Sequence, residues 1–383
     1  MPSADELLGA ASAQALARAI STAVPGSPRP ALQAAGNRLD GLSLRERADF
    51  LRDALLADLP GSYADLARAL RAAAGSEEFT GWLIWPVTSA VAVKAVEADQ
   101  AGAEPTAFDD ALALLAELTP RLTSEFAVRV LLRHDLDRAL SIISAWTDSS
   151  DEHVRRLASE GTRPYLPWSV RVPGILARPG ATVSLLDTLY RDESDYVRRS
   201  VANHLNDLSR DHPELVVNTA RRWLADPAPH TPALIRHALR TLIKRGNPDA
   251  LSLLGFAPAA VEISGPRLDS TAVPFDGSVR FTASIRNTGD EPARLAVDYI
   301  VHHSKANGSQ TAKTFKLTTA TLDPGQSITL TRGHSFRPIT TRRYYPGPHA
   351  ITLQVNGVPS ERADFELLPA SVPAAATEPV PAS

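Results

Sequence analysis

The spacing of apolar residues divides the chain into two regions. From the N-terminus to about residue 257, alanine and leucine recur every three or four positions, as in LRERADFLRDALLADL (44–59) and YADLARALRAA (63–73). This spacing predicts amphipathic helices. From about residue 258, apolar and polar residues alternate in short segments such as SVRFTASIRN (278–287), the pattern of half-buried strands. The pattern therefore predicts a mainly α-helical chain that ends in an all-β region.

The helical region contains an internal repeat. DEHVRRLASEG (151–161) aligns with SDYVRRSVANH (194–204) at an offset of 43 residues, and ALIRHALRTLIKRG (233–246) is a looser third copy. Periods of about 40–47 residues with paired helices are typical of HEAT-like repeats, which stack into a curved solenoid with an extended concave surface. We therefore predict a HEAT-like helical-repeat solenoid for this region.

Arginines recur in register within the repeat, since Arg155 and Arg156 correspond to Arg198 and Arg199. Such recurrence favours a binding stripe along one face, and the alternative is a solvated arginine ridge. Neighbours on a helix point about 100° apart, so only one residue of each pair can face a ligand.

The C-terminal region has about seven short alternating segments separated by turn signals, the pattern of an immunoglobulin-like β-sandwich. The chain has no cysteine, so this sandwich would lack a disulfide. We expect a helical-repeat domain at residues 1–257 and an immunoglobulin-like domain at 258–368. Residues 369–383 are rich in proline and alanine and are predicted to be disordered.

Composition removes several classes of function. Without cysteine the chain has neither thiolate metal sites nor a cysteine nucleophile, which agrees with a cytoplasmic location. No apolar run is long enough to span a membrane, and the N-terminal segment does not resemble a secretory signal. There is no lysine between residues 121 and 243, so Schiff-base chemistry has no amine to use there.

The formal net charge of −3 argues against a nucleic-acid partner, but the charge is unevenly distributed. Residues 1–120 contain 9 basic and 16 acidic side chains, whereas residues 121–250 contain 19 basic and 16 acidic ones. The middle of the chain can therefore hold a basic face although the whole chain is slightly acidic.

The segment 151–168 contains a carboxylate and a tryptophan in unusual positions. Glu160 lies in the last turn of a predicted helix that Gly161 ends, where the helix dipole disfavours a carboxylate by about 0.3–1 kcal/mol. Pro164 and Pro167 then restrict the backbone, so Trp168 would be presented from a rigid loop. The alternative is a surface helix packed by a tryptophan.

Two further carboxylates stand out in the repeat region. Glu125 lies at a predicted helix start, and Asp207 shares a helix face with Asn203, four residues earlier. Each has a simpler explanation, because Glu125 would be favoured in a first helical turn and Asp207 could be a cap. Trp82 and Trp85 are expected to be core or packing residues, since aromatic residues at helical spacing usually pack.

Three segments of the chain resemble the AlkC family of alkylpurine DNA glycosylases. They are SEFAVRVLL (124–132), HVRRLASEGTRPYLPW (153–168) and DYVRRSVANHLNDLSRDHPELV (195–216). The resemblance implies a HEAT-like repeat enzyme that excises N-alkylated bases from DNA, in some members with a C-terminal immunoglobulin-like domain. It also implies an active site with acidic residues and a tryptophan, which fall here at Glu125, Glu160, Trp168 and Asp207. The chain departs from the family at Tyr165, where members usually have arginine in RPRLPW.

These residue types suit the implied reaction. A base alkylated on a ring nitrogen is cationic, so it leaves without protonation, and carboxylates can stabilise an oxocarbenium-like transition state and direct water. A tryptophan face attracts a cation by about 0.5–2 kcal/mol. We expect no cofactor and no metal.

The expected partner is duplex DNA that contains alkylated bases, with no membrane and no obligate protein partner, and the chain is expected to be a monomer. As a repair enzyme it would act at the bacterial nucleoid. We expect Arg156 and Arg199 to contact phosphates, while Arg155 or Arg198 binds carboxylates between repeats. Further candidate DNA contacts are Arg163, Asn203, Arg342 and Arg343. His153, His204 and His237 could contact phosphate or solvent equally well.

Arg342 and Arg343 lie in the loop TTRRYYPGPH (340–349). Its arginines and tyrosines beside a Pro–Gly turn would suit a minor-groove probe; alternatively, a tyrosine packs a corner of the sandwich and the arginines are solvated. Two other functions stay open for the whole chain: a non-catalytic helical-repeat scaffold that binds a protein, and a DNA-binding repeat protein without activity.

Overall fold

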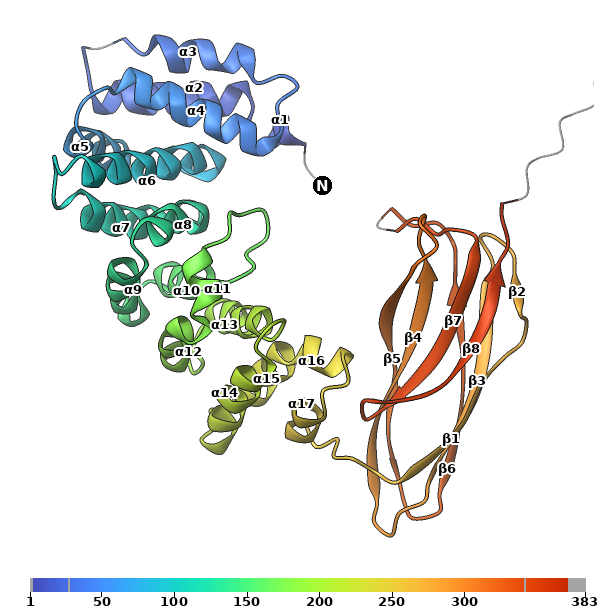
Figure 1. Ribbon diagram of the computed structural model, residues 1–383. Coiled ribbons are helices and arrows are strands. Elements are labelled where there is room, and N and C mark those ends of the chain that lie inside the picture. The colour runs from blue at the N-terminus through green and yellow to red at the C-terminus, as the bar shows by residue number, and fades with distance from the viewer. Residues whose placement is uncertain (1–2, 27, 341, 371–383) are drawn as a thin grey trace, which may run out of the picture. The chain divides into compact units, whose positions relative to one another are not determined.

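The computed structural model describes residues 3–26, 28–340 and 342–370. The chain divides into two compact units, Met1–Ala238 and Leu239–Ser383. The first is helical and the second contains all of the named strands (Figure 1). This confirms the predicted fold class, a helical-repeat region followed by an immunoglobulin-like β-sandwich. Most of the predicted disordered tail, residues 369–383, lies outside the described residues.

The helices of the first unit follow one another along a stack (Figure 1). Several of them begin at a capping box, in which Ser3, Ser43 or Ser62 exchanges hydrogen bonds with an acidic residue three positions later. The elements are α1 (Ala4–Leu8), α2 (Ala10–Ala23), α3 (Pro30–Ala35), η1 (Gly36–Arg38), α4 (Leu44–Asp58), α5 (Tyr63–Ala73), η2 (Gly81–Leu83), α6 (Ile84–Gln100), α7 (Ala107–Leu118), α8 (Glu125–His134), α9 (Leu136–Ser144), η3 (Ala145–Asp148), α10 (Glu152–Glu160), α11 (Pro173–Ala177), η4 (Pro179–Thr182), α12 (Val183–Leu189), α13 (Asp195–Leu208), α14 (Pro213–Ala225) and α15 (Thr231–Ala238), where η marks a short 3-10 helix.

The repeat found in the sequence corresponds to packed helices, because α13 contacts both α10 and α15. The equivalent arginines Arg155 and Arg198 make equivalent bonds. Arg155 donates to the carbonyls of Ser149 and Ser150 at 2.9 and 3.1 Å, and Arg198 donates to the carbonyls of Asp192 and Glu193, both at 2.7 Å. In each repeat the arginine therefore fastens the turn that precedes its own helix.

Arg155 also forms an ion pair with Asp192, the residue of the next repeat that aligns with Ser149, at 2.7 Å. Both side chains are largely buried. One of the two expected arginines thus binds a carboxylate between repeats.

The second unit begins with two short helices, α16 (Arg240–Lys244) and α17 (Pro248–Leu253). They are grouped with the strands, whereas the sequence pattern predicts a boundary after residue 257. Thr314 donates from its hydroxyl to the carbonyl of Lys244 at 3.1 Å. The backbones of Gly246 and Gly357 lie so close that a Cβ on Gly246 would be 2.8 Å from the Cα of Gly357.

The strands form two sheets, with orders β1-β3-β6 and β2-β8-β7-β4-β5. Alternate residues of β3 and β4 point into a shared apolar core, which includes Phe281, Leu295 and Tyr299. The strands are β1 (Val261–Leu268), β2 (Ala272–Val273), β3 (Ser278–Asn287), β4 (Ala293–Ser304), β5 (Gln310–Leu322), β6 (Ser327–Ser335), β7 (Gly347–Val355) and β8 (Val358–Leu367).

Three histidines lie in the core of the sandwich. His303 on β4 is 3% exposed, and its ring centroid is 5.7 Å from that of His334 on β6 and 5.8 Å from that of His349 on β7. Both ring nitrogens of His303, Nε2 of His334 and Nδ1 of His349 are buried without a hydrogen-bond partner. Burial is the first cause that lowers their pKa values, for His303 to about 3 and for His334 to about 4.

Among the described residues, no helix has both the length and the apolar character needed to cross a membrane.

Candidate functional site

The three carboxylates selected from the sequence lie near helix ends in the first unit. Glu125 is the first residue of α8, Glu160 is the last residue of α10, and Asp207 is the penultimate residue of α13. They are 9%, 6% and 1% exposed. Because a buried charge is costly unless it is paired, each of these side chains requires a cationic or hydrogen-bonding partner.

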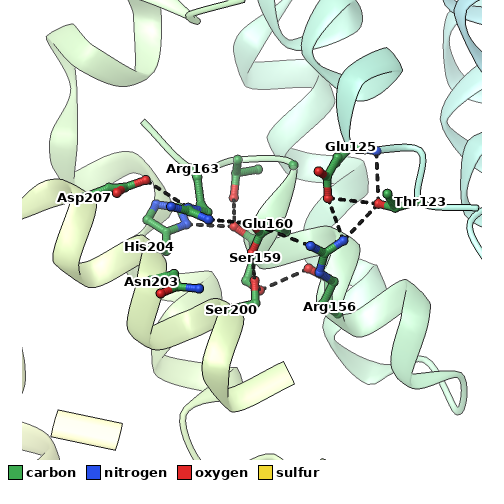
Figure 2. A network of polar contacts seen from close by, with 12 residues as sticks. Thr123, Glu125, Arg156, Ser159, Glu160, Arg163, Ser200, Asn203, His204 and Asp207 are labelled. Atoms are coloured by element: carbon green, nitrogen blue, oxygen red, sulfur yellow. Dashed lines mark hydrogen bonds and ion pairs between the residues drawn. The ribbon is translucent and has the colours of Figure 1, made fainter. Parts of the chain in front are cut away.

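Two arginines connect the carboxylates into one network (Figure 2). Arg156 lies 2.6 Å from Glu125 and 3.5 Å from Glu160. Arg163 lies 2.6 Å from Glu160 and 2.9 Å from Asp207. The order is therefore acid, arginine, acid, arginine, acid, and every member is largely buried. The fold brings together side chains that are 82 positions apart in the sequence, as the numbering of Glu125 and Asp207 shows.

Neutral groups complete the hydrogen bonding of Glu160. Ser200 donates to its Oε2 at 2.7 Å, and the hydroxyls of Ser200 and Ser159 are 2.6 Å apart. His204 lies beside Glu160 (Figure 2), and its Nδ1 is 2.9 Å from the carbonyl of Ser159. His204 is fully buried, and this burial lowers its pKa to about 4, so at neutral pH it is uncharged and has no access to phosphate.

Burial raises the pKa of Asp207. Arg163, Arg210 and the backbone N–H of Tyr165 oppose the rise, because each favours the ionised carboxylate. Desolvation is the main cause of the rise, and the arginines separate the carboxylates from one another.

A pocket of about 270 Å³ opens beside Glu125 and Glu160. Most of its lining is apolar, and the two carboxylates and Arg163 supply its charges. Asp207 does not line it and lies behind Arg163. The lining residues are Trp82, Leu122, Thr123, Glu125, Phe126, Glu160, Arg163, Leu166, Pro167 and Trp168.

Trp168 is 73% exposed and has a φ of +58°. The left-handed region is unfavourable for a side chain with a Cβ, by roughly 1–2 kcal/mol, so the surrounding structure must hold this conformation. Arg45 donates to the carbonyl of Trp168. The predicted presentation of the tryptophan from a loop is thus seen, in a conformation that the two prolines alone do not require.

Gly161 ends α10 as predicted, but its φ of −63° is right-handed. The glycine instead allows α8 and α10 to pack closely here. A Cβ at this position would lie 3.3 Å from Cγ1 of Val128 on α8 and 3.0 Å from the carbonyl oxygen of Leu157.

Arg163, an expected DNA contact, is 7% exposed and lies between two carboxylates. Its charge is used by these carboxylates, since a buried carboxylate requires a cationic partner, and its assignment to DNA stays an untested prediction. Arg156 donates a hydrogen bond to Glu125, and its guanidinium carbon lies 5.2 Å from the centre of the Tyr196 ring.

Arg199 remains a candidate for contact with DNA. Its side chain is 68% exposed and forms an ion pair with Asp195 at 2.7 Å. It borders a pocket of about 210 Å³ whose lining includes His230 and His237. Asn203 lies nearby, with Oδ1 3.0 Å from Nε2 of His237. The assignment of Arg199 and Asn203 to DNA stays a prediction.

In the second unit, Arg343 is exposed and its guanidinium carbon lies 5.3 Å from the centre of the Tyr345 ring. Arg342 is half-buried. Tyr344 is 9% exposed and packs on Phe336, so this tyrosine belongs to the sandwich core, as one of the two alternatives held. The assignment of both arginines to DNA is untested, and Thr341 of the same loop lies outside the described residues.

Tyr165, which replaces the usual arginine of the family, has well-defined partners. Its ring lies between the guanidinium carbons of Arg171 and Arg210, at 4.5 and 4.7 Å from its centre. Its hydroxyl donates to Asp211. The side chain therefore attaches the loop that carries Trp168 to the end of α13.

Trp82 was expected to be a core or packing residue, and it does pack on Trp85, with ring centroids 6.1 Å apart. Sequence reasoning missed that Trp82 is also half-exposed and lines the pocket. Trp85 is 6% exposed and stacks on Phe126 at 4.7 Å, so for this residue the prediction was correct. Both tryptophans occur in GWLIW, and nothing in that segment separates the pocket residue from the packing residue. Within the described parts of the chain, no group of three or more His, Asp or Glu side chains is arranged to hold a metal ion.

Comparison with known proteins agrees with this arrangement. Residues 262–369 match the family model of the C-terminal immunoglobulin-like domain of the uncharacterised protein YhaZ. The chain is 33% identical to YhaZ of Bacillus subtilis (strain 168) over 327 residues, which cover 85% of this chain and 88% of YhaZ.

The structure also resembles that of the Pseudomonas fluorescens alkylpurine DNA glycosylase AlkC bound to DNA containing an abasic site analogue. The TM-score is 0.83 at 35% identity, and the match covers 96% of this chain and 100% of the other. The match spans nearly the whole chain, and the resemblance found in the sequence is thereby confirmed: the chain belongs to the AlkC family.

Proposed function

We propose that this chain is a monofunctional DNA glycosylase that hydrolyses the N-glycosidic bond of cationic, N-alkylated bases of the 3-methyladenine type in duplex DNA. The observation that carries the proposal is the placement of Glu125 and Glu160 on the wall of a mostly apolar pocket, with Arg163 and Trp168 beside them. The similar AlkC enzyme, which was solved with DNA containing an abasic site analogue, gives independent support.

The two carboxylates act on the sugar. As the cationic base departs, positive charge develops at the anomeric carbon, and carboxylates that the fold holds in place can stabilise it. Arg156 and Arg163 hold Glu160 in place together with Ser200, so that both carboxylate oxygens are engaged by donors. Glu160 is therefore well suited to fixed electrostatic stabilisation.

We assign the direction of water to Glu125. Its Oε2 accepts from Arg156 and Thr123 at 2.6 and 3.1 Å. Among the contacts of the described residues, none involves its Oε1. That oxygen can accept a proton from a water molecule in the pocket while Arg156 holds the carboxylate in place.

Trp168 and Asp207 complete the proposed site. Trp168 offers an exposed aromatic face that attracts a cationic base or sugar by cation–π interaction, worth about 0.5–2 kcal/mol. Asp207 is the third acid, one arginine removed from the pocket lining. Hydrolysis without a lysine in residues 121–243 agrees with a glycosylase that leaves an abasic site and forms no Schiff base.

For DNA binding we propose Arg199 and Asn203 in the helical unit and Arg342 and Arg343 in the sandwich. The exposed guanidinium groups of Arg199 and Arg343 suit phosphate or minor-groove contacts. A chain that ends at Ala238 follows the division between the two units. It should remain folded but bind DNA and release bases less well than the full chain.

The function is tested with methylated duplex DNA under single-turnover conditions. The full chain should release free alkylated base and leave an abasic site that borohydride does not trap on the protein. Glu125→Gln should slow release by about 10²–10⁴-fold while DNA affinity stays the same. Glu152→Gln, which changes an exposed acid of α10, is the matched control. Base release by Glu125→Gln at the rate of the unchanged chain would refute the assignment.

A further inference from the structure

Arg129 of α8 is a fully buried arginine that reaches both ends of the loop carrying Trp168. It is 0% exposed. Its Nη1 donates to the carbonyls of Gly161 and Arg163 at 3.0 and 2.7 Å, and its Nε donates to the carbonyl of Val170 at 2.6 Å. Gly161 and Val170 bracket the loop, so a single guanidinium closes it.

The carbonyls of Gly161 and Arg163 lie just beyond the last residue of α10. An arginine close to a helix C-terminus can donate to carbonyls there, and its positive charge interacts favourably with the negative end of the helix dipole. Burial and the neighbouring Arg163 lower the pKa of Arg129 to about 10, which leaves it charged at neutral pH.

The third bond acts on Trp168. Trp168 has a left-handed φ of +58°, which persists only if the surrounding structure holds it. Arg45 holds the carbonyl of Trp168 itself, and Arg129 holds the carbonyl two residues later. Loss of the Arg129–Val170 bond would allow the backbone around Trp168 to relax toward ordinary dihedral angles.

We propose that Arg129 is a positioning residue of the site. It does not reach the pocket itself, and it sets the position of Trp168 by closing the loop from Gly161 to Val170. Arg129 does not line the pocket, whereas Leu166, Pro167 and Trp168 of the loop do. The effect on catalysis rests on the proposed function, but the effect on the loop does not.

The loop can be observed directly, because the chain has no cysteine. Ser169→Cys provides a single site for a nitroxide spin label next to Trp168. In the otherwise unchanged chain the label should give the spectrum of an immobilised group. With Arg129→Lys, which removes the fork that reaches three carbonyls, the spectrum should shift to fast motion.

Arg29→Lys is the matched control. Arg29 is 1% exposed and also donates to backbone carbonyls, those of Pro28 and Val24, both at 3.1 Å. It should leave the label at position 169 immobile. A fast-moving label in the unchanged chain, or an equally immobile label with Arg129→Lys, would overturn the proposal whether or not the protein is a glycosylase. If Arg129→Lys does not fold, Arg129→Gln replaces it. The spectrum of the unchanged chain is still a test, because a fast-moving label there would overturn the proposal.

A catalytic readout separates positioning from general stability. Arg129→Lys should slow single-turnover base release by about 10-fold or more, since small displacements of a positioned group are costly, with DNA affinity unchanged. In a chain that already carries Trp168→Ala, the same substitution should cause little further loss. Equal losses in both backgrounds would show that Arg129 does not act through Trp168. A chain that releases no base at all, but whose label responds as expected, would contradict the proposed function and leave the positioning role supported.

Discussion

Arg156 and Arg199 occupy equivalent positions of the repeat, yet Arg156 is buried against Glu125 while Arg199 is exposed beside Asp195. Equivalent positions in the sequence have therefore acquired different environments. The difference determines which of the two arginines can meet a phosphate.

Arg199→Gln should weaken DNA binding evenly across sequences. It removes one exposed positive charge, so the log–log dependence of affinity on salt should decrease by about 0.9. Arg156→Gln should leave this slope unchanged and slow base release, because its charge is used by carboxylates. Binding titrations at several salt concentrations measure both slopes. An equal decrease in slope for both variants would place Arg156 on the DNA, as first expected from the sequence.

Glu160→Gln and Asp207→Asn should each abolish most base release while DNA affinity is kept. Each change removes a charge and nearly preserves the shape of the side chain. Asp207→Asn also releases Arg163 from one of its two carboxylates, so it should lower the melting temperature more than Glu152→Gln does. Single-turnover excision and calorimetry measure these effects. Normal excision by both variants would remove these two carboxylates from the proposed catalytic set.

Tyr165→Phe should leave base release unchanged, because the ring between Arg171 and Arg210 is retained. Tyr165→Ala should slow release and mobilise a spin label at position 169. The two cation–π contacts that it removes are worth about 0.5–1 kcal/mol each at an exposed site. If the alanine variant matches the phenylalanine variant in both measurements, the tyrosine ring does not hold the loop.

The sandwich should lose stability as the pH falls below about 6.5, the ordinary pKa of histidine. The pKa values of His303 and His334 are lowered to about 3 and 4 in the folded state, so the unfolded chain takes up these protons first. Each histidine should then remove about 1.4 kcal/mol of stability per pH unit until its folded pKa is reached. Asp298, whose pKa is raised to about 6 by burial, opposes the trend, because its folded form takes up a proton earlier than its unfolded form.

His303→Leu isolates this effect, since Asp298 is unchanged in the comparison. The variant should be less sensitive to acid by about 1.4 kcal/mol per pH unit. At neutral pH it should be at least as stable as the unchanged chain, because it removes two buried nitrogens without partners. All five tryptophans precede residue 239, so calorimetry rather than tryptophan fluorescence is required. An unchanged pH dependence would show that His303 does not titrate in this range.

The candidate site was predicted from residues whose local chemistry was out of place. Glu160 at a helix C-terminus and a tryptophan after two prolines were visible as anomalies within one short segment. Glu125 and Asp207 stood out on predicted helices, and the AlkC resemblance then grouped them with Glu160 and Trp168. The arginine partners were not predictable in this way. Arg163 was expected on DNA because nothing local indicates that the fold buries it between Glu160 and Asp207, residues from two different helices.

The fold was predictable for a related reason. Helical and alternating periods are local properties, and they divided the chain into its two structural classes. The division between units was harder to place, because α16 and α17 have a helical pattern but belong to the unit of the strands. Lys244 at the end of α16 bonds to Thr314, and Gly246 lies against Gly357. Trp82 differs from Trp85 only in its tertiary neighbours, so its place in the pocket could not be read from GWLIW.

The paired bonds of Arg155 and Arg198 bear on how the chain folds. Each arginine donates to carbonyls only five and six residues earlier, so the start of each repeat can form from local contacts alone. In the sandwich, by contrast, Ala272 pairs with Glu366 and Ser278 with Ser335, and such distant pairs close slowly. Because synthesis begins at the N-terminus, the helical unit, whose contacts are local in sequence, is made first. The helical unit is thus able to finish folding on the ribosome while the strands are still being made.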